Sequence, residues 1–228
     1  MEVLTLNNEQ RCIVVEENVK EHLLLLNPLS ATLHITQHAG SEVTLHCLRF
    51  PAASLDRSSS CSCKIEVEQL GAGCRTSIYG MAMLQGNERF DLSTHVRHTV
   101  GGGFSQQLVK YLLAGHSHGS FYGELVIAKD AQQTEAHQTN RNILLSPTAR
   151  MDSKPQLEIY ADDVKASHGA TTGQLDSASL FYMQQRGISL KDARRMLLHA
   201  FISDVIDTLP DTLNLSDNIE TAFNSLNI

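Results

Sequence analysis

The sequence predicts a mainly β protein that ends in a small α-helical subdomain. From Val3 to about Ile159, short segments alternate apolar and polar residues with a period of two, the pattern of strands that bury one face. Successive segments are spaced too widely for tight hairpins and too closely for strand–helix–strand units. After Gly173 the apolar residues recur at helical spacing instead. We therefore expect a β domain over residues 1–172 and a helical subdomain over residues 173–228.

The strand pattern is clear in eight segments, which together account for most of the expected β domain. They are residues 32–36, 43–50, 64–70, 90–98, 106–113, 124–128, 142–146 and 156–161. Short strands joined by bends can stack as the rungs of a solenoid or wind into a sandwich. The periodicity does not distinguish between these two architectures.

The helical region divides into three expected helices. The first covers residues 175–187 and ends at a glycine that suits a C-cap. The second begins at Ser189, which can form a capping pair with Asp192, and ends before Pro210. The third covers residues 217–226. An apolar stripe on the second helix can pack against the β domain, and part of it can also bind a partner protein.

Charge and hydropathy exclude several classes of function. The formal net charge is −7, which argues against nucleic-acid binding because that requires a basic surface. No apolar run approaches the roughly 20 residues that span a bilayer. The first ten residues lack the pattern of a signal peptide, so we expect a cytoplasmic protein without membrane or nucleic-acid partners.

Cysteine and histidine are the residue types that could bind a metal. The chain has five cysteines, and Cys61 and Cys63 should point to the same face of one strand as ordinary packed or surface thiols. Eleven histidines include the close pairs His34 and His38, His95 and His98, and His116 and His118. No H-E-x-x-H helix accompanies them, so we expect these pairs to face solvent along the strands.

Motifs for independent catalysis are missing from the sequence. The chain has no G-x-x-x-x-G-K-[ST] phosphate loop and no G-x-S-x-G nucleophile elbow. Asp162 and Asp163 are adjacent and would point to opposite faces of a strand, which is a poor arrangement for acid–base catalysis. We therefore expect that the chain alone is not an enzyme.

Four segments carry a resemblance to a known family. They are SPTARMDSKPQLEIYADDVKASHGATTGQLD at 146–176, the run at 121–146, HTVGGGFSQQLVKYLLAG at 98–115 and the run at 180–206. In these segments the sequence resembles the SufB/SufD family of the SUF iron–sulfur cluster assembly system, and it resembles SufD more than its paralogue SufB. The resemblance implies a right-handed parallel β-helix (a solenoid) followed by a small C-terminal helical subdomain. Family members are longer and carry a helical region before the β-helix.

The same resemblance implies a non-catalytic scaffold subunit with two partners. SufD pairs with SufB through the β-helices, and each of them binds one copy of the ATPase SufC. The SufC contact lies in the helical subdomain, which corresponds here to residues 175–209. The candidate contact residues are Leu190, Ala193, Met196, Leu197 and Phe201. In isolation, exposed interface strands would favour a homodimer.

A histidine of the SHGAT motif supplies the candidate metal ligand. Here it is His168, which the resemblance implies as a ligand of iron or of a nascent iron–sulfur cluster at the SufB interface. Many SufD sequences have a cysteine two positions earlier, where this chain has Ala166. Asp162, Asp163 and Lys165 are expected to end the last rung of the β-helix. We expect no cofactor to be bound tightly by this chain alone.

An alternative function is a stand-alone histidine-rich metal-binding β protein or a cupin-like enzyme. It requires a stoichiometric metal held by a pair such as His95 and His98, or His116 and His118. In that case a change at His168 would leave the metal in place.

Overall fold

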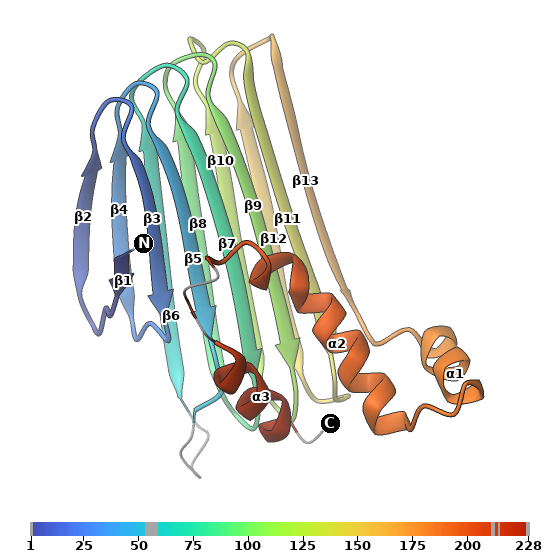
Figure 1. Ribbon diagram of the computed structural model, residues 1–228. Coiled ribbons are helices and arrows are strands. Elements are labelled where there is room, and N and C mark those ends of the chain that lie inside the picture. The colour runs from blue at the N-terminus through green and yellow to red at the C-terminus, as the bar shows by residue number, and fades with distance from the viewer. Residues whose placement is uncertain (1, 53–58, 211–212, 214, 227–228) are drawn as a thin grey trace.

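The computed structural model describes residues 2–52, 59–210, 213 and 215–226. In these residues thirteen strands are followed by three helices (Figure 1). The strands are β1 (Glu2–Leu4), β2 (Gln10–Val15), β3 (Lys20–Leu26), β4 (Ala31–Gln37), β5 (Glu42–Arg49), β6 (Ser60–Gln69), β7 (Arg75–Leu84), β8 (Arg89–His98), β9 (Phe104–Leu113), β10 (His118–Ile127), β11 (Thr134–Leu144), β12 (Arg150–Ile159) and β13 (Val164–Gly173). The helices are α1 (Ser177–Gln185), α2 (Leu190–Ile206) and α3 (Ser216–Ser225).

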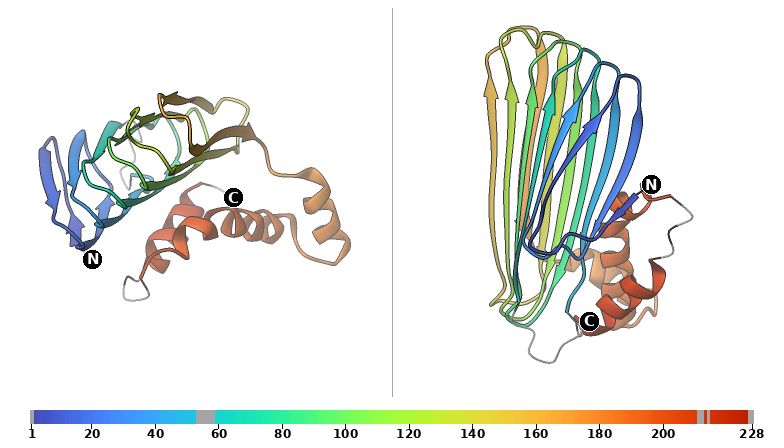
Figure 2. Two further views of the ribbon diagram at one scale, coloured as in Figure 1. Left: turned by 90° about the horizontal axis from the view of Figure 1, so that it is seen from above. Right: turned by 90° about the vertical axis from the view of Figure 1, so that its left-hand side faces the viewer.

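The strands form a parallel β-helix. The odd-numbered strands make one seven-stranded sheet and the even-numbered strands make a six-stranded sheet, each in chain order. All the strand pairs between named elements are parallel, so the chain alternates between the two sheets and advances one rung with every two strands. Figure 2 shows the two sheets facing each other along the length of the molecule. The expected solenoid with a C-terminal helical region is confirmed, and the sandwich is excluded.

Alternation along each strand builds the core between the two sheets. Parallel pairing places equivalent residues of successive rungs side by side, so apolar residues stack on apolar residues. In one such row Leu45 pairs with Leu23 and Ile78, and all three side chains are fully buried. The next two positions of this row are Gln107 and Gln138, which are also buried. This row of the lumen, the space between the two sheets, is therefore apolar in the N-terminal rungs and polar in the C-terminal rungs.

Turns with a repeated backbone geometry keep the rungs in register. Each turn from an even-numbered to an odd-numbered strand, from the β2–β3 turn to the β10–β11 turn, contains one residue in the left-handed conformation. These residues are Asn18, Gly40, Gly73, Gly102 and Gln133, with φ angles of 58, 67, 69, 74 and 58°. Glycine and asparagine adopt this conformation at little cost, which explains four of the five choices.

The helices lie against the outer face of the seven-stranded sheet. Apolar residues of α2 and α3, including Leu198, Ile202 and Phe223, form a second core with Met81 and Leu112 of the sheet. Figure 2 shows α2 and α3 covering this face, whereas α1 projects beyond the end of the β-helix. Helix α1 has no buried residues.

Both predicted helix-capping features are present. The Asp192 backbone N–H donates to the Ser189 hydroxyl over 3.1 Å, so the predicted pair begins α2. Gly187 follows α1 with a φ of 84° and provides the expected glycine stop. Helix α1 itself begins at Ser177, because the Asp176 carboxylate accepts from the backbone N–H groups of Ala178 and Ser179.

No helix in the described part of the chain is both long and apolar enough to span a membrane.

A buried charge fixes α2 to the sheet. The Lys110 ammonium group of β9 donates to a carboxylate oxygen of Asp204 over 2.6 Å and to the Phe201 carbonyl oxygen over 2.5 Å. The Lys110 side chain is 2% exposed, and its nitrogen lies 4.8 Å from the centre of the Phe201 ring. The hydrogen bond from Lys110 lowers the pKa of Asp204. A buried ammonium group needs such partners, so the position of α2 depends on this contact.

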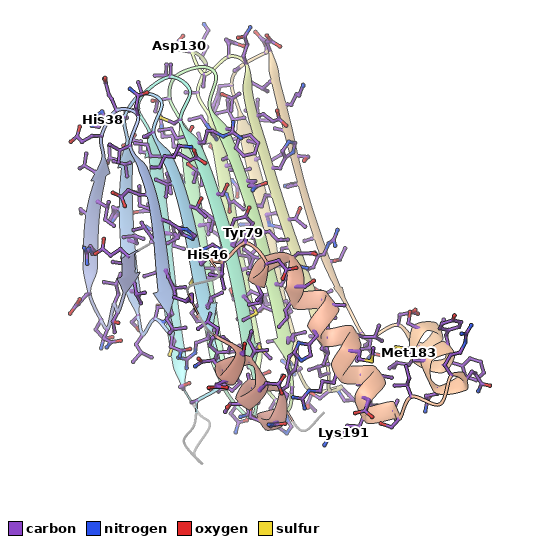
Figure 3. The ribbon with its side chains drawn as sticks, viewed as in Figure 1. His38, His46, Tyr79, Asp130, Met183 and Lys191 are labelled. Carbon is purple, nitrogen blue, oxygen red and sulfur yellow. The ribbon has the colours of Figure 1, made fainter. Side chains whose placement is uncertain are left out.

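A second polar contact joins the end of α2 to the sheet. His46 Nε2 is hydrogen-bonded to the Thr208 hydroxyl at 2.8 Å, and His46 Nδ1 to His22 at 3.0 Å. The His46 ring also stacks on Tyr79, with 5.1 Å between ring centres (Figure 3). Burial, together with the neighbouring His22, lowers the pKa of His46 to about 4. His46 is therefore neutral near pH 7 and acts as a structural contact.

Substitutions of Lys110 and of Asp204 should lower the free energy of unfolding by different amounts. Asp204→Ala leaves a buried ammonium group without its carboxylate and should lower the free energy of unfolding by about 2–3 kcal/mol. Lys110→Met removes the charge and keeps the apolar stem, so its cost should be below about 1 kcal/mol. Urea unfolding followed by circular dichroism measures both values. The double variant should match Lys110→Met, and equal costs for the two single variants would contradict this explanation.

Candidate functional site at the open end of the β-helix

The last rung of the β-helix has exposed strand edges. Strand β12 ends the six-stranded sheet and pairs with β10 alone, and β13 ends the seven-stranded sheet and pairs with β11 alone. Most residues of β13 are exposed. Unpaired strand edges present rows of N–H and C=O groups that can pair with another chain. The open end is therefore a potential pairing surface.

His168 lies in the middle of this last strand and on its lumen side. Val164 and Ala166 of β13 pack against the core between the sheets, and strand alternation places His168 on the same side. Ser167 points outward instead, where its hydroxyl is hydrogen-bonded to His137 at 2.7 Å. His168 is exposed because no further rung covers it in the described chain.

The expectation that Asp162, Asp163 and Lys165 end the last rung is wrong. Asp162 and Asp163 precede β13, and Lys165 lies within it, so these residues begin a further strand. The sequence AxHxAxT on the lumen side of β13 has little apolar character, because an edge strand buries little of either face. The apolar alternation that identified the other strands is therefore weak here.

The surroundings of His168 allow another molecule to approach. A Cβ atom on the neighbouring Gly169 would meet no atom within 4 Å. Ala166 is half-buried and contributes no thiol. No group of three or more histidine, cysteine, aspartate or glutamate side chains in the described residues could hold a metal ion. An imidazole at this edge can supply one ligand, and the others would have to come from a second chain.

The second candidate surface lies on the helices, and the structure separates its predicted residues. Leu190 and Met196 are exposed, with 41% and 53% of their surface accessible. Leu197 and Phe201 are half-buried, and Ala193 is completely buried. Only the first two are therefore fully available on the surface of α2.

Two exposed aromatic residues of α1 were missed by the sequence analysis. Phe181 and Tyr182 are 63% and 60% exposed. Together with Leu190 and Met196 of α2, they are the four exposed apolar residues that we call the helical apolar surface. Adjacent residues in a helix point about 100° apart, so a narrow core face would not cover both aromatic side chains, and the adjacent pair was a signal of exposure in the sequence.

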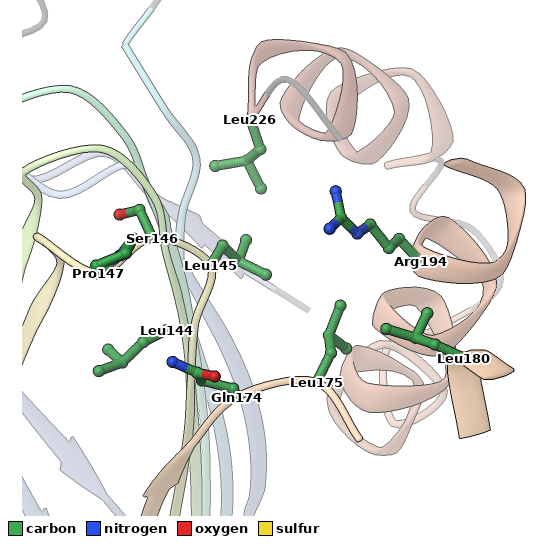
Figure 4. Close-up of a pocket in the computed structure, with 9 residues that line it drawn as sticks. All are labelled: Leu144, Leu145, Ser146, Pro147, Gln174, Leu175, Leu180, Arg194 and Leu226. Carbon is green, nitrogen blue, oxygen red and sulfur yellow. The ribbon is translucent and has the colours of Figure 1, made fainter. Parts of the chain in front are cut away.

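An open groove separates α1 from the β-helix (Figure 4). Its volume is about 380 Å³, and it lies between the end of β11, the segment before α1, and helices α1 and α2. Leu145, Leu175 and Leu226 point towards it from different elements, and the Arg194 side chain lies across from them (Figure 4). Helix α1 thus contacts α2 and leaves much of its own surface accessible.

The histidine pairs do not converge on a common metal. His95 points outward and is hydrogen-bonded to Glu124, whereas His98 is buried in the lumen and hydrogen-bonded to the Ser105 hydroxyl at 2.8 Å. The prediction that this pair faces solvent is therefore wrong for His98, because three residues along a strand reverse the face. His118 is hydrogen-bonded to Asp152 at 2.7 Å. Burial lowers the pKa of His98 to about 4.

The cysteines of the CSC segment are core residues. Cys61 and Cys63 are buried in the same core, as their predicted common face requires. A hydrogen bond with Cys63 and burial raise the pKa of the Cys47 thiol. A thiol with a raised pKa is a poor nucleophile and a poor metal ligand near pH 7.

The architecture and the open end together define a β-solenoid protein with an exposed pairing edge. Residues 29–201 match the family model described as SUF system FeS cluster assembly, SufBD core domain. This match covers most of the chain, which therefore belongs to the SufB/SufD family of iron–sulfur cluster assembly proteins.

Individual relatives agree with the family match. The chain is 40% identical to the iron–sulfur cluster assembly protein SufD of Escherichia coli K12 over 141 residues, which are 62% of this chain and 33% of that protein. It is 37% identical to protein ABCI7, chloroplastic, of Arabidopsis thaliana over 207 residues, which are 87% of this chain and 42% of that protein. The chain thus spans less than half the length of either relative.

Buried neutral histidine should make the fold sensitive to acid. The pKa of His98 is about 4 in the folded chain and near 6.5 when unfolded, so the unfolded state binds more protons between these values. Stability should be complete above pH 6.5 and should fall by about 2–3 kcal/mol by pH 4.5 through His98 alone. Urea unfolding at several pH values measures this dependence. His98→Gln should reduce the slope and the exposed-site control His116→Gln should not; an unchanged slope in His98→Gln would refute the assignment.

Proposed function

We propose that this chain is a non-catalytic, SufD-like scaffold subunit of a SUF iron–sulfur cluster assembly complex. The observation that carries the proposal is the position of His168 on the exposed edge strand of the last rung. A single imidazole at an edge is an incomplete ligand set, and a partner that pairs with this edge would complete it. Membership of the SufB/SufD family gives the nature of the cargo, a nascent iron–sulfur cluster.

SufB is the partner proposed for the open end. Pairing along β12 and β13 would satisfy the N–H and C=O groups of both edges. It would also bring ligands of the partner, such as a cysteine thiolate, to the side of His168 that no rung of the described chain covers. Without SufB, a second copy of this chain is the expected occupant of the same edge, which gives a homodimer.

SufC is the partner proposed for the helical apolar surface. Four large apolar side chains are exposed on α1 and α2, and exposed apolar side chains of this kind favour a protein contact. They are Phe181, Tyr182, Leu190 and Met196. Ala193, one of the residues expected to touch SufC, is completely buried and would therefore not contact the partner.

Copurification with SufB and SufC from the same organism tests the two assignments. Phe181→Asp and Met196→Asp place a charge in the helical apolar surface without disturbing a core, and each should weaken SufC binding at least 10-fold. Val14→Asp is the matched control, since Val14 is 56% exposed on β2 at the other end of the β-helix. SufC binding that survives both helical substitutions would show that the contact lies elsewhere.

The role of His168 needs a separate test in the assembled complex. His168→Ala should leave SufB and SufC bound and should remove most of the reconstituted cluster, measured by its visible absorbance and by iron and sulfide content. His137→Ala is the control on the neighbouring strand, because its side chain points outward next to Ser167. A His168→Ala complex that holds as much cluster as the unchanged protein would exclude the ligand role.

A further inference from the structure

A chain of polar side chains crosses the lumen towards the open end. The Thr94 hydroxyl of β8 donates to the Gln107 Oε1 atom of β9 over 2.6 Å. The same oxygen accepts from the Gln138 Nε2 atom of β11 over 3.3 Å. All three side chains are at least 98% buried. In this arrangement the Gln138 amide nitrogen faces Gln107.

The oxygen of the Gln138 side-chain amide lacks a hydrogen-bond donor. Gln138 Oε1 is buried and has no hydrogen-bond partner. A buried carbonyl oxygen without a donor is costly, and native proteins rarely leave one. The absence of a side chain at Gly123 of β10 also makes room for the amide, since a Cβ atom at that position would lie 2.2 Å from Gln138 Nε2. Gly123 therefore leaves the space that the Gln138 amide occupies.

His168 is the register partner of Gln138 in the direction of the open end. Gln138 of β11 and His168 of β13 are register partners, and both lie on the lumen side of their strands. Register partners in a parallel sheet are about 4.8 Å apart, which is within reach of a glutamine and a histidine side chain. The His168 side chain is exposed, so a rotation about its own bonds can bring a ring N–H to Gln138 Oε1.

We propose that Gln138 is a positioning residue that accepts a hydrogen bond from one ring nitrogen of His168. The bond fixes the tautomer of the neutral imidazole, so that the other nitrogen presents its lone pair outward at the open end. A metal-binding histidine usually needs such a partner on its second nitrogen, and loss of the partner typically weakens metal binding or activity 10- to 100-fold. The metal-binding part of this role depends on the function proposed for His168, whereas the hydrogen bond does not.

Histidine tautomers in the isolated chain test the hydrogen bond directly. Long-range ¹H–¹⁵N spectra of the 15N-histidine-labelled protein at pH 8 report which ring nitrogen carries the proton, and His168→Ala identifies the signals. The unchanged chain should show one dominant His168 tautomer, and Gln138→Leu should convert it to a mixture. Gln138→Glu retains an acceptor oxygen and should restore the single form, since Gln107 Nε2 has no partner and can turn to donate to it.

Two further variants separate a specific effect from a disturbed fold. Gly123→Ala should displace the Gln138 amide and produce the same tautomer mixture without any change at Gln138. Gln106→Leu is the matched control, because Gln106 lies on the outer face of β9 and bonds to Ser77 and Tyr79. A Gln138→Leu protein with a native circular dichroism spectrum and an unchanged His168 tautomer would overturn the proposal.

Cluster content of the SufB complex completes the test and distinguishes the two proposals. Gln138→Leu should lower cluster retention roughly 10-fold, with recovery in Gln138→Glu. If His168→Ala retains its cluster, the ligand role fails, and the tautomer experiment still decides whether Gln138 positions His168. If His168→Ala loses its cluster but Gln138→Leu keeps a full complement, the positioning role is refuted by itself.

Discussion

Parallel in-register stacking is the constraint on which the rest of this structure depends. Each rung satisfies the backbone and covers the lumen side chains of the rung before it, so equivalent positions must be chemically compatible along the whole row. Leu23, Leu45 and Ile78 meet this requirement with apolar contacts, and Gln107 and Gln138 meet it with amide hydrogen bonds. The last rung receives this support from one side only. The edge of this rung is exposed and its histidine is accessible for the same reason: no further rung is stacked on it in the described chain.

The helices are joined to this stack through charge as well as apolar packing. Asp204 of α2 bonds to Lys110 of β9, and Lys110 is the register partner of Arg141 on β11. Arg141 also lowers the pKa of Asp204 and is itself the register partner of Thr171 on the edge strand. A displacement of α2 would thus act on the same strands that end at β13. Under the proposed function, this gives a short physical connection between the helical apolar surface, where SufC would bind, and the open end of the β-helix, where SufB would pair.

The sequence predicted those parts of the fold in which a residue has one dominant environment. Strands such as β4 and β8 alternate strictly because one face is in the core, and Ser189 caps α2 because its local partner is three residues away. Strand β13 was not recognised as a strand with His168 at its centre, because an edge strand needs no apolar face. The inward direction of His98 follows from its three-residue spacing from His95 once both lie on one strand. The burial of Ala193 depends on contacts made across the fold, which spacing along the chain does not reveal.

Polar side chains of β11 line part of the lumen next to the open end. Asn140 and Asn142 are bonded to each other, and Asn142 also donates to the Thr171 carbonyl oxygen and to the Thr172 hydroxyl of the edge strand. Directional bonds hold β13 in place at little apolar cost, so the last rung can remain exposed to water without collapsing. An apolar lumen at the same position would need permanent cover. The scaffold role proposed above would require an edge that tolerates water when no partner covers it, and polar residues such as Asn140 and Asn142 suit that requirement.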